Sequence, residues 1–291
     1  MSCEQRSRAR HDSRSVRSRR TFLGQSGALA LSPWVIPASA LGAEGAAPSE
    51  RITLGSIGVG MMGQGHLRRF LHAPDAQVLA IADVDRWRRE THQAGVNAHY
   101  AEQRKVGAYK GCDIYNDFRD LLARSDIDAV VIATGERWHP LLTILAAKAG
   151  KDIYVEKPVA LVISEARAMV TAVRRYGRVC QVGLQQRSGR EFRLACQLVR
   201  DGVLGKIECV YAIHNGASGD PDLPAEPIPD TLDWDLWLGP SPWRPFNHRL
   251  HHLGPPRHVV PWDICRDFGG GSLTSGGVHA FDTVQWGLDA D

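Results

Sequence analysis

Short apolar runs alternate with helix-compatible segments through the first half of the chain. The runs at residues 52–57, 78–82, 128–134, 153–155 and 179–182 are rich in aliphatic and β-branched side chains, which is typical of buried parallel strands. Residues 64–71, 141–149 and 165–175 lie between them and favour helices. Strands separated by helices form right-handed βαβ units. The pattern therefore predicts an α/β fold with a doubly wound parallel sheet.

The pattern changes after residue 187. Residues 190–200 predict a helix, residues 206–213 a strand, and residues 279–288 a further helix. Residues 215–261 are rich in proline and predict a long loop region that also holds several tryptophans. A second domain that differs in type from the first is therefore expected.

A glycine-rich turn joins the first predicted strand to the first predicted helix. It reads GVGMMG, from Gly58 through Gly60, Met61 and Met62 to Gly63. Gly58 permits a tight turn, Gly60 lets the backbone approach a pyrophosphate, and Gly63 lets the helix pack close to the strand. The unpaired N–H groups at the start of the helix favour negative charge. The turn therefore predicts a dinucleotide site.

Polar residues at the ends of later strands extend this site. Asp83 follows the second strand, where its carboxylate can accept hydrogen bonds from the adenosine ribose and repel a 2′-phosphate. NAD is therefore predicted, and the arginines at positions 86, 88 and 89 keep NADP open as an alternative. Ligands of such sheets bind beyond the carboxyl ends of the strands. The further residues predicted to bind the cofactor there are Thr134, His139, Glu156 and Lys157.

Charge is concentrated at the start of the chain. Seven of the 35 Lys and Arg residues lie in the first twenty positions, and the chain beyond residue 40 carries 28 basic and 30 acidic side chains. That balance offers nucleic acid no basic surface, so no nucleic-acid partner is expected.

The basic run is followed by an uncharged stretch that ends in Ala38-Ser39-Ala40, which is the order of a signal peptide. With Arg19 and Arg20 it resembles a twin-arginine leader, and a disordered basic tail is the alternative. We expect residues 1–43 to be an export signal read by the twin-arginine machinery, 44–50 a linker, and the protein to be periplasmic or otherwise exported. Glycines and prolines interrupt the stretch, so no membrane span is expected.

The cysteines and histidines do not indicate a metal site. The six cysteines are scattered without a CxxC pair, which predicts buried or free thiols. His248, His251, His252 and His258 lie in a proline-rich stretch without helical spacing. We interpret them as solvated loop residues, and no metal is expected.

Several motifs together resemble one family. They are the glycine turn, Trp138-His139, Glu156-Lys157-Pro158, GLQQR at 183–187, and GGG at 269–271 followed by His279. Over residues 51–291 the chain resembles the glucose–fructose oxidoreductase, inositol dehydrogenase and MocA family, and its leader resembles the exported branches of that family. The resemblance implies a Rossmann domain over 51–183 and an α+β substrate domain with an open, mostly antiparallel sheet over 184–291. Members usually continue through several more strands, so this second domain is expected to be incomplete.

The resemblance also implies catalytic roles. Lys157 would hydrogen-bond the reacting hydroxyl, where its charge stabilises an alkoxide-like oxygen while hydride leaves for nicotinamide. His279 would be the general base. Many members carry an aspartate four residues before this histidine, whereas this chain has Ser275, which cannot supply the negative charge. Asp267 and Asp282 are nearby carboxylates that are candidates to replace it.

Substrate contacts are predicted for Gln185, Arg187, Trp243 and His279. Aromatic faces such as that of Trp243 stack on sugar C–H groups, and core or lid packing is the alternative role. We therefore expect an NAD(P)-dependent oxidoreductase that acts on the CH–OH group of a sugar, sugar acid or cyclitol, as a homo-oligomer. Two alternatives stay open. One is an NAD-using glycosidase or epimerase that restores its cofactor in each cycle, and the other is a non-catalytic dinucleotide-binding protein.

Overall fold

The computed structural model describes residues 50–214, 216–254 and 261–290. The predicted export signal, nearly all of the predicted linker and His258 lie outside these residues.

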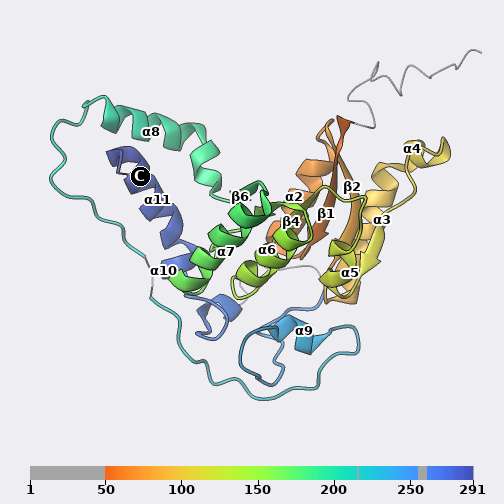
Figure 1. The fold of residues 1–291 in the computed structure, drawn as a ribbon. Coiled ribbons are helices and arrows are strands. Elements are labelled where there is room, and N and C mark those ends of the chain that lie inside the picture. Colours follow the sequence, from red (N-terminus) through yellow and green to blue (C-terminus); the bar gives the residue numbers. More distant parts are fainter. Residues whose placement is uncertain (1–49, 215, 255–260, 291) are drawn as a thin grey trace, which may run out of the picture. The chain divides into compact units, whose positions relative to one another are not determined.

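One parallel sheet organises the first half of the described chain (Figure 1). Its strands are β1 (Ile52–Ile57), β2 (Ala76–Ala82), β3 (Asp113–Tyr115), β4 (Ala129–Ile132), β5 (Asp152–Val155) and β6 (Cys180–Val182). They lie in the order β3-β2-β1-β4-β5-β6, and all neighbours are parallel. The order reverses between β1 and β4, which is where such sheets bind ligands. The doubly wound sheet predicted from the apolar runs is confirmed, with β3 as an additional short edge strand.

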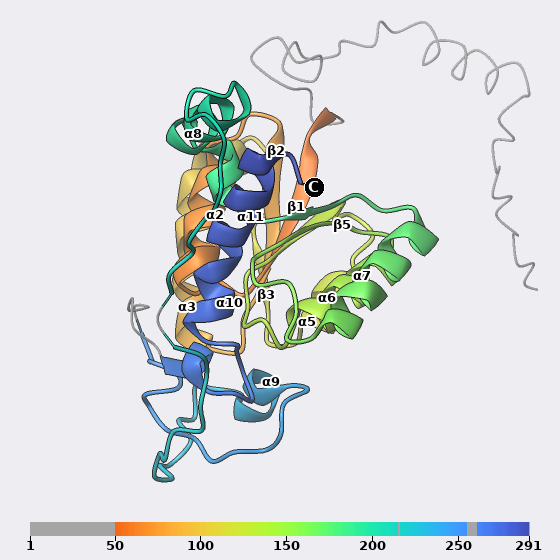
Figure 2. The same cartoon turned by 90° about the vertical axis from the view of Figure 1, so that its left-hand side faces the viewer.

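Helices cover both faces of this sheet, as Figure 2 shows. The face that carries α2 (Met61–Leu71) and α3 (Arg86–His99) buries Leu54, Leu67, Val78 and Val96 in one cluster. The other face carries α5 (Phe118–Leu122), α6 (His139–Lys148) and α7 (Ile163–Tyr176). A short helix, α4 (Ala101–Lys105), follows α3.

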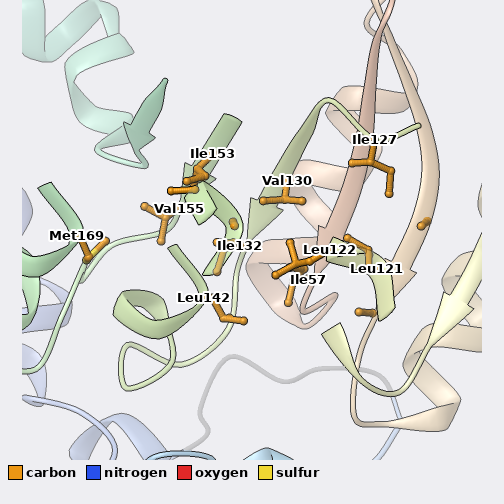
Figure 3. Close-up of a cluster of buried hydrophobic side chains, with 14 residues drawn as sticks. Ile57, Leu121, Leu122, Ile127, Val130, Ile132, Leu142, Ile153, Val155 and Met169 are labelled. Atoms are coloured by element: carbon orange, nitrogen blue, oxygen red, sulfur yellow. The ribbon is translucent and has the colours of Figure 1, made fainter. Parts of the chain in front are cut away.

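A second and larger cluster of buried apolar side chains fills the space between the sheet and α5, α6 and α7 (Figure 3). Ile57, Ile132 and Val155 come from three neighbouring strands, and Leu142 and Met169 come from the helices. Each of these side chains is almost completely buried. Burying one side chain of this size stabilises the fold by roughly 1.5–3 kcal/mol, so this cluster fixes the positions of the strand ends that form the site.

The second half of the chain contains helices and long connections. Its elements are η3 (Gln185–Ser188), α8 (Arg190–Arg200), α9 (Trp234–Leu238), η4 (Pro261–Ile264), α10 (Ser272–Ser275) and α11 (Gly277–Leu288). The helices predicted over 190–200 and 279–288 are confirmed as α8 and α11, which pack against each other. No helix within the described ranges has the length and hydropathy needed to cross a membrane.

The strand predicted over residues 206–213 is wrong. These residues have no regular structure, and the side chains of Tyr211 and Ile213 are 83% and 89% exposed. A strand requires a neighbour for its N–H and C=O groups. In the described part of the chain beyond residue 184, β-type pairing is limited to isolated bridges, so residues 206–213 have no such neighbour. The β-branched composition alone did not determine the structure.

The described cysteines agree with the sequence interpretation. Cys112, Cys196 and Cys265 are buried free thiols, Cys180 is partly buried, and Cys209 is exposed. Burial raises the pKa of the Cys112 thiol to about 12, so this sulfur remains protonated and packs as a small apolar group.

Candidate active site

A cleft of about 310 Å³ opens beyond the carboxyl ends of β1, β2, β4 and β5. Its opposite wall comes from α9, from His251, and from the segment that contains Trp262, Asp263 and Ser275. Eight of the residues predicted from the sequence line this one cleft: Gly58, Gly60, Met61, Met62, Asp83, Thr134, Glu156 and Lys157.

The glycine turn has the geometry that a pyrophosphate requires. Gly58 has a φ of +82°, which favours glycine, and a Cβ on Gly63 would stand 2.0 Å from the carbonyl oxygen of Gly58. The α2 helix begins at Met61 without a side-chain cap and without an acidic residue in its first turn. The first N–H groups of α2 are therefore free to bind an anion, and the turn fits the phosphates of a dinucleotide.

Asp83 fastens this turn to the end of β2. Its buried carboxylate accepts hydrogen bonds from the N–H of Val59 at 2.8 Å and from the N–H of Asp85 at 2.9 Å. Each carboxylate oxygen can accept a second bond, so Asp83 remains able to bind a ribose hydroxyl. Arg88 also lines the cleft, where it donates to the carbonyl of His252 at 3.0 Å. This cation, which lines the same cleft as Asp83, keeps NADP open as an alternative.

Glu156 is the centre of a buried polar cluster behind the cleft. Its Oε1 lies 2.6 Å from Nε2 of His66 and accepts a hydrogen bond of 2.6 Å from the amide of Gln185. Its Oε2 accepts the N–H of Lys157 at 3.1 Å. Gln185 does not line the cleft, so it acts on the site by positioning Glu156. The peptide bond between Lys157 and Pro158 is cis.

Lys157 reaches across the cleft to the last residue of α10. Its Nζ donates a hydrogen bond of 3.0 Å to the carbonyl oxygen of Ser275. His279 stands in the first turn of α11 and does not line the cleft. Burial and the charge of Lys157 lower the pKa of His279, so its imidazole is neutral at pH 7. Its Nδ1 is buried and has no hydrogen-bond partner among the residues that the structure describes.

His139 and Gly63 support the cleft without lining it. His139 Nδ1 lies 2.6 Å from the carbonyl of Pro158, and its Nε2 lies 3.2 Å from the carbonyl of Thr134. Burial lowers the pKa of His139 to about 4, so the neutral ring can donate to one of the two carbonyls, and the shorter distance favours Pro158. His139 therefore ties two strand ends together.

The two carboxylates suggested as replacements for the missing aspartate do not line the cleft. Asp282 forms an ion pair with Arg187 at 2.9 Å, and neither Asp282 nor Asp267 lines the cleft. Two other carboxylates do, Glu136 and Asp263. Trp243 does not line the cleft either, and it is 71% exposed.

Glu136 is the most perturbed acid at the site. It follows β4 and is 1% exposed, and its Oε1 accepts hydrogen bonds from the N–H of Gly270 and, at 3.5 Å, from the hydroxyl of Thr274. Burial raises the pKa of Glu136 to about 7; the charge of Asp263 adds to this, and the bond from Gly270 and the charge of Lys157 oppose it. The sequence signal was present, because Glu136 and Arg137 are charged residues at the carboxyl end of an apolar strand.

Arg137 anchors the β4 loop in an aromatic cluster formed by the second half of the chain. The guanidinium lies 4.1 Å from the ring of Trp237 and 4.8 Å from that of Phe268. It donates to the carbonyls of Trp237 at 2.6 Å and Leu238 at 3.2 Å, while Nη1 has no partner in the described part of the chain. Cation–π contacts and these two bonds offset much of the cost of burying the charge.

The interpretation of the loop histidines as solvated is wrong for His251. It is 4% exposed, and its Nδ1 accepts the indole N–H of Trp237 at 3.0 Å. Its Nε2 therefore carries the proton and donates to Asp85 at 3.0 Å. His248 pairs with Glu226 at the surface, as a loop histidine would. Because Asp85 lies over a hundred residues earlier, sequence spacing gave no sign of this buried network. Within the described ranges, no group of three or more His, Cys, Asp or Glu side chains could hold a metal.

Two family models match the chain. One, described as "Oxidoreductase family, NAD-binding Rossmann fold", matches residues 52–184, and the other, described as "Oxidoreductase family, C-terminal alpha/beta domain", matches residues 203–291. The first confirms the prediction of NAD as the cofactor and agrees with the glycine turn described above.

Similar curated proteins share part of the chain. A protein from Shewanella sp. (strain W3-18-1), named "Glycosyl hydrolase family 109 protein", is 35% identical over 161 residues, which are 54% of this chain and 33% of that protein. A protein of the same family name from Shewanella sp. (strain ANA-3) is 34% identical over 163 residues, or 54% of this chain and 34% of that protein. The match thus spans about one third of the length of these relatives.

Solved structures show the same fold. A putative NADPH-dependent oxidoreductase from Desulfitobacterium hafniense has a TM-score of 0.53 at 18% identity, over 82% of this chain and 55% of that chain. An oxidoreductase domain protein from Kribbella flavida has a TM-score of 0.50 at 24% identity, over 82% and 54%. Since the two family models together match most of the chain and the cleft has the dinucleotide geometry they require, this chain belongs to the Gfo/Idh/MocA oxidoreductase family.

Proposed function

We propose that this chain is an NAD(P)-dependent oxidoreductase that transfers hydride between the CH–OH group of a sugar, sugar acid or cyclitol and a nicotinamide cofactor. The observation that carries the proposal is the position of Lys157. Its ammonium group lies in the cleft that contains the glycine turn, and the carbonyl of Ser275 holds it there at 3.0 Å. A fixed cation beside a dinucleotide site suits a reaction in which an alcohol oxygen gains negative charge.

The residues that would hold the cofactor follow from the geometry. The N–H groups at the start of α2 would bind the pyrophosphate, with Gly58 and Gly60 leaving room for it, and Asp83 would bind the adenosine ribose. When bound, the nicotinamide accepts or donates the hydride. Glu156 and His139 hold the strand ends that shape this part of the cleft.

Lys157 would bind the reacting hydroxyl of the substrate, and His279 would take up its proton. The ammonium group has three N–H donors, one of which is used by Ser275, so the other two can bind the reacting hydroxyl. His279 is neutral at pH 7 and its charge state is coupled to that of Lys157, so its imidazole can take up the proton that leaves the site. Because His279 does not line the cleft, the proton must reach it through another group.

A second candidate function is a glycosidase that uses NAD and restores it in each cycle. The observation that favours it is the name of the curated relatives, glycosyl hydrolase family 109, at 34–35% identity over half of this chain. Both functions use the same cleft and the same lysine. They differ in whether reduced nicotinamide accumulates.

A single-turnover experiment tests the proposal. Protein loaded with NAD is mixed with sugars, sugar acids and inositols while the near-ultraviolet band of reduced nicotinamide is recorded. We expect a band that grows and persists with one class of substrate, and that disappears in Lys157→Met. Lys105→Met, at a 70% exposed surface lysine, is the matched control and should behave as the wild type.

The other outcomes discriminate between the candidates. Sugar cleaved without a persistent band would support the glycosidase. An unchanged substrate and no band would refute both enzymes and leave a dinucleotide-binding protein. A Lys157→Met variant with normal turnover would overturn the site assignment.

Export and assembly are also part of the proposal. The adjacent Arg19 and Arg20 and the uncharged stretch after them support export by the twin-arginine route, and fractionation of cells that express an Arg19→Lys, Arg20→Lys variant tests it. Retention of wild-type levels in the periplasm would refute this route. The exposed apolar side chains of Val203, Tyr211 and Ile213 support a homo-oligomer, which light scattering of the purified protein tests.

A further inference from the structure

The cleft contains an acid that the family resemblance did not assign. Ser275 stands where many relatives have an aspartate, and His279 does not line the cleft. We propose that Glu136 is a further catalytic residue, which directly accepts the hydroxyl proton of the substrate during oxidation and returns it during reduction. This inference rests on the proposed function, because it assigns the proton transfer of the same reaction.

The fold places Glu136 next to the strand that carries Lys157. It is in the loop after β4, and Lys157 follows the neighbouring strand β5, so both side chains project from adjacent strand ends. Both line the cleft together with Ser275 and Asp263. Lys157 is close enough for its charge to act on Glu136. A substrate hydroxyl bound by Lys157 would therefore share the cleft with the carboxyl group of Glu136.

One oxygen of Glu136 is fixed, and the other is available. Oε1 accepts the N–H of Gly270 and the hydroxyl of Thr274, which together fix the orientation of the carboxyl group. Oε2 accepts no hydrogen bond within the described residues. It is not completely closed off from solvent. An acid with one anchored oxygen and one oxygen without a hydrogen-bond partner in the described residues is arranged to exchange a proton without changing its position.

The surrounding charges prepare Glu136 for transfer in both directions. Burial and the carboxylate of Asp263 favour its protonated form, while the cations of Lys157 and of its neighbour Arg137 favour the ionised form. The balance gives Glu136 a pKa of about 7, so both forms are populated at neutral pH. Proton transfer is most efficient when the pKa of the catalytic group lies near the working pH.

Asp263 supports both the position and the protonation of Glu136. It lines the same cleft, and burial raises its pKa as well. Its backbone carbonyl accepts the N–H of Gly271, so this residue holds the loop that carries the anchor of Glu136. Asp263 thereby positions Gly270 and contributes the like charge that favours the protonated form of Glu136.

The proposed oxidation removes one proton and one hydride from the substrate. The O–H bond of the substrate breaks and its proton forms a bond with Oε2 of Glu136. The adjacent C–H bond breaks and its hydride passes to the oxidised nicotinamide dinucleotide, which is the oxidant. The substrate becomes a carbonyl compound, and Glu136 releases the proton to solvent or to His279 before the next turnover.

Two measurements on the full chain test the inference. The first is the pH dependence of kcat/KM in the wild type, Glu136→Gln and Glu136→Asp. The glutamine keeps the oxygen that accepts the N–H of Gly270 but takes up no proton, so we expect kcat to fall by about 100-fold or more and the limb near pH 7 to disappear. KM should change little, and Glu136→Asp should retain the limb. Glu102→Gln, at an exposed carboxylate, is the control for loss of one charge.

The second measurement is independent of activity. Carbon-13 NMR of glutamate carboxyl groups in the protein without cofactor should show one carboxyl that titrates near pH 7 and that is absent from Glu136→Gln. A Glu136→Gln enzyme with wild-type kcat and an unchanged pH limb would overturn the inference, and so would the absence of a carboxyl that titrates between pH 6 and 8. If the wild type transferred hydride to no substrate, the proposed function would be refuted, and the catalytic role of Glu136 with it. The NMR titration would still measure the pKa of the Glu136 carboxyl group.

Discussion

The close crossing of β1 and α2 leads to a prediction whose size follows from the structure. Replacing Gly63 with alanine puts a Cβ 2.0 Å from the carbonyl oxygen of Gly58, whereas such contacts are essentially never shorter than 3.0 Å. The backbone must therefore open by about 1 Å, because a carbonyl group cannot rotate away as a side chain can. Overpacking of this kind costs roughly 1–3 kcal/mol, and the rigid neighbour places this variant near the upper value.

Both stability and cofactor binding should respond. For a chain of this size, about 3 kcal/mol lowers the melting temperature by roughly 6–12 °C. The displacement also moves the first N–H groups of α2 away from the pyrophosphate. Loss of one hydrogen bond to a charged group, about 1.5–3 kcal/mol, weakens NAD binding by about 10- to 100-fold. Calorimetry measures both quantities on the same sample.

The same helix supplies the control. A Cβ on Gly65, two residues further along α2, meets nothing within 4 Å. Gly65→Ala should stabilise the protein by roughly 0.5–1 kcal/mol through helix propensity and leave NAD binding unchanged. If Gly63→Ala melts and binds NAD like Gly65→Ala, the reasoning about the close crossing is wrong.

Three further predictions concern charged residues of the cleft. Arg137→Met leaves two buried carbonyl groups without donors and should destabilise the protein by about 2–4 kcal/mol in urea unfolding. Arg119→Met, at an exposed arginine, should have a far smaller effect, and equal effects would show that the contacts of Arg137 are unimportant. Glu136 has its folded pKa raised from 4.5 to about 7, so the stability it contributes is complete below pH 4.5 and is lost as the pH rises through about 7. Glu136→Gln should therefore gain stability over the wild type between pH 4.5 and pH 8, by an amount on the order of 3 kcal/mol, and a difference that stays constant with pH would contradict this. Asp83→Asn removes the charge that repels a 2′-phosphate and should shift the ratio of NADP to NAD affinity toward NADP by about 10-fold in fluorescence titrations, so an unchanged ratio would exclude Asp83 as the selecting residue.

The first half of the fold could be predicted because its information is local. Each strand of the sheet except β3 lies in a short, mostly apolar run, and the glycine turn has fixed spacing. The residues at the carboxyl ends of the strands then lie together for a topological reason, which is why most of the predicted cofactor residues line one cleft. β3 was missed because three residues carry too little periodicity.

The rest could not be predicted because it depends on contacts between distant parts of the chain. His251 pairs with a residue 166 positions earlier, and Arg137 binds carbonyls about 100 positions later. Charged and polar residues in loops are usually solvated, so only tertiary structure shows that these two are buried. The strand expected over 206–213 failed for the complementary reason, since a β-forming sequence still requires a neighbouring strand.

The position of Arg137 also sets an order of events during synthesis. The β4 loop leaves the ribosome well before Trp237 and Leu238, the residues whose carbonyls it binds. Until that later segment arrives, the guanidinium remains in water and Glu136 lacks the N–H of Gly270 that anchors its carboxyl group. Contacts of such long sequence separation form late, because closing the intervening chain costs entropy before any contact compensates for it. The sheet can therefore assemble on the nascent chain, but the cleft is completed only after synthesis has passed Gly270. We therefore expect the cofactor to bind at the end of folding.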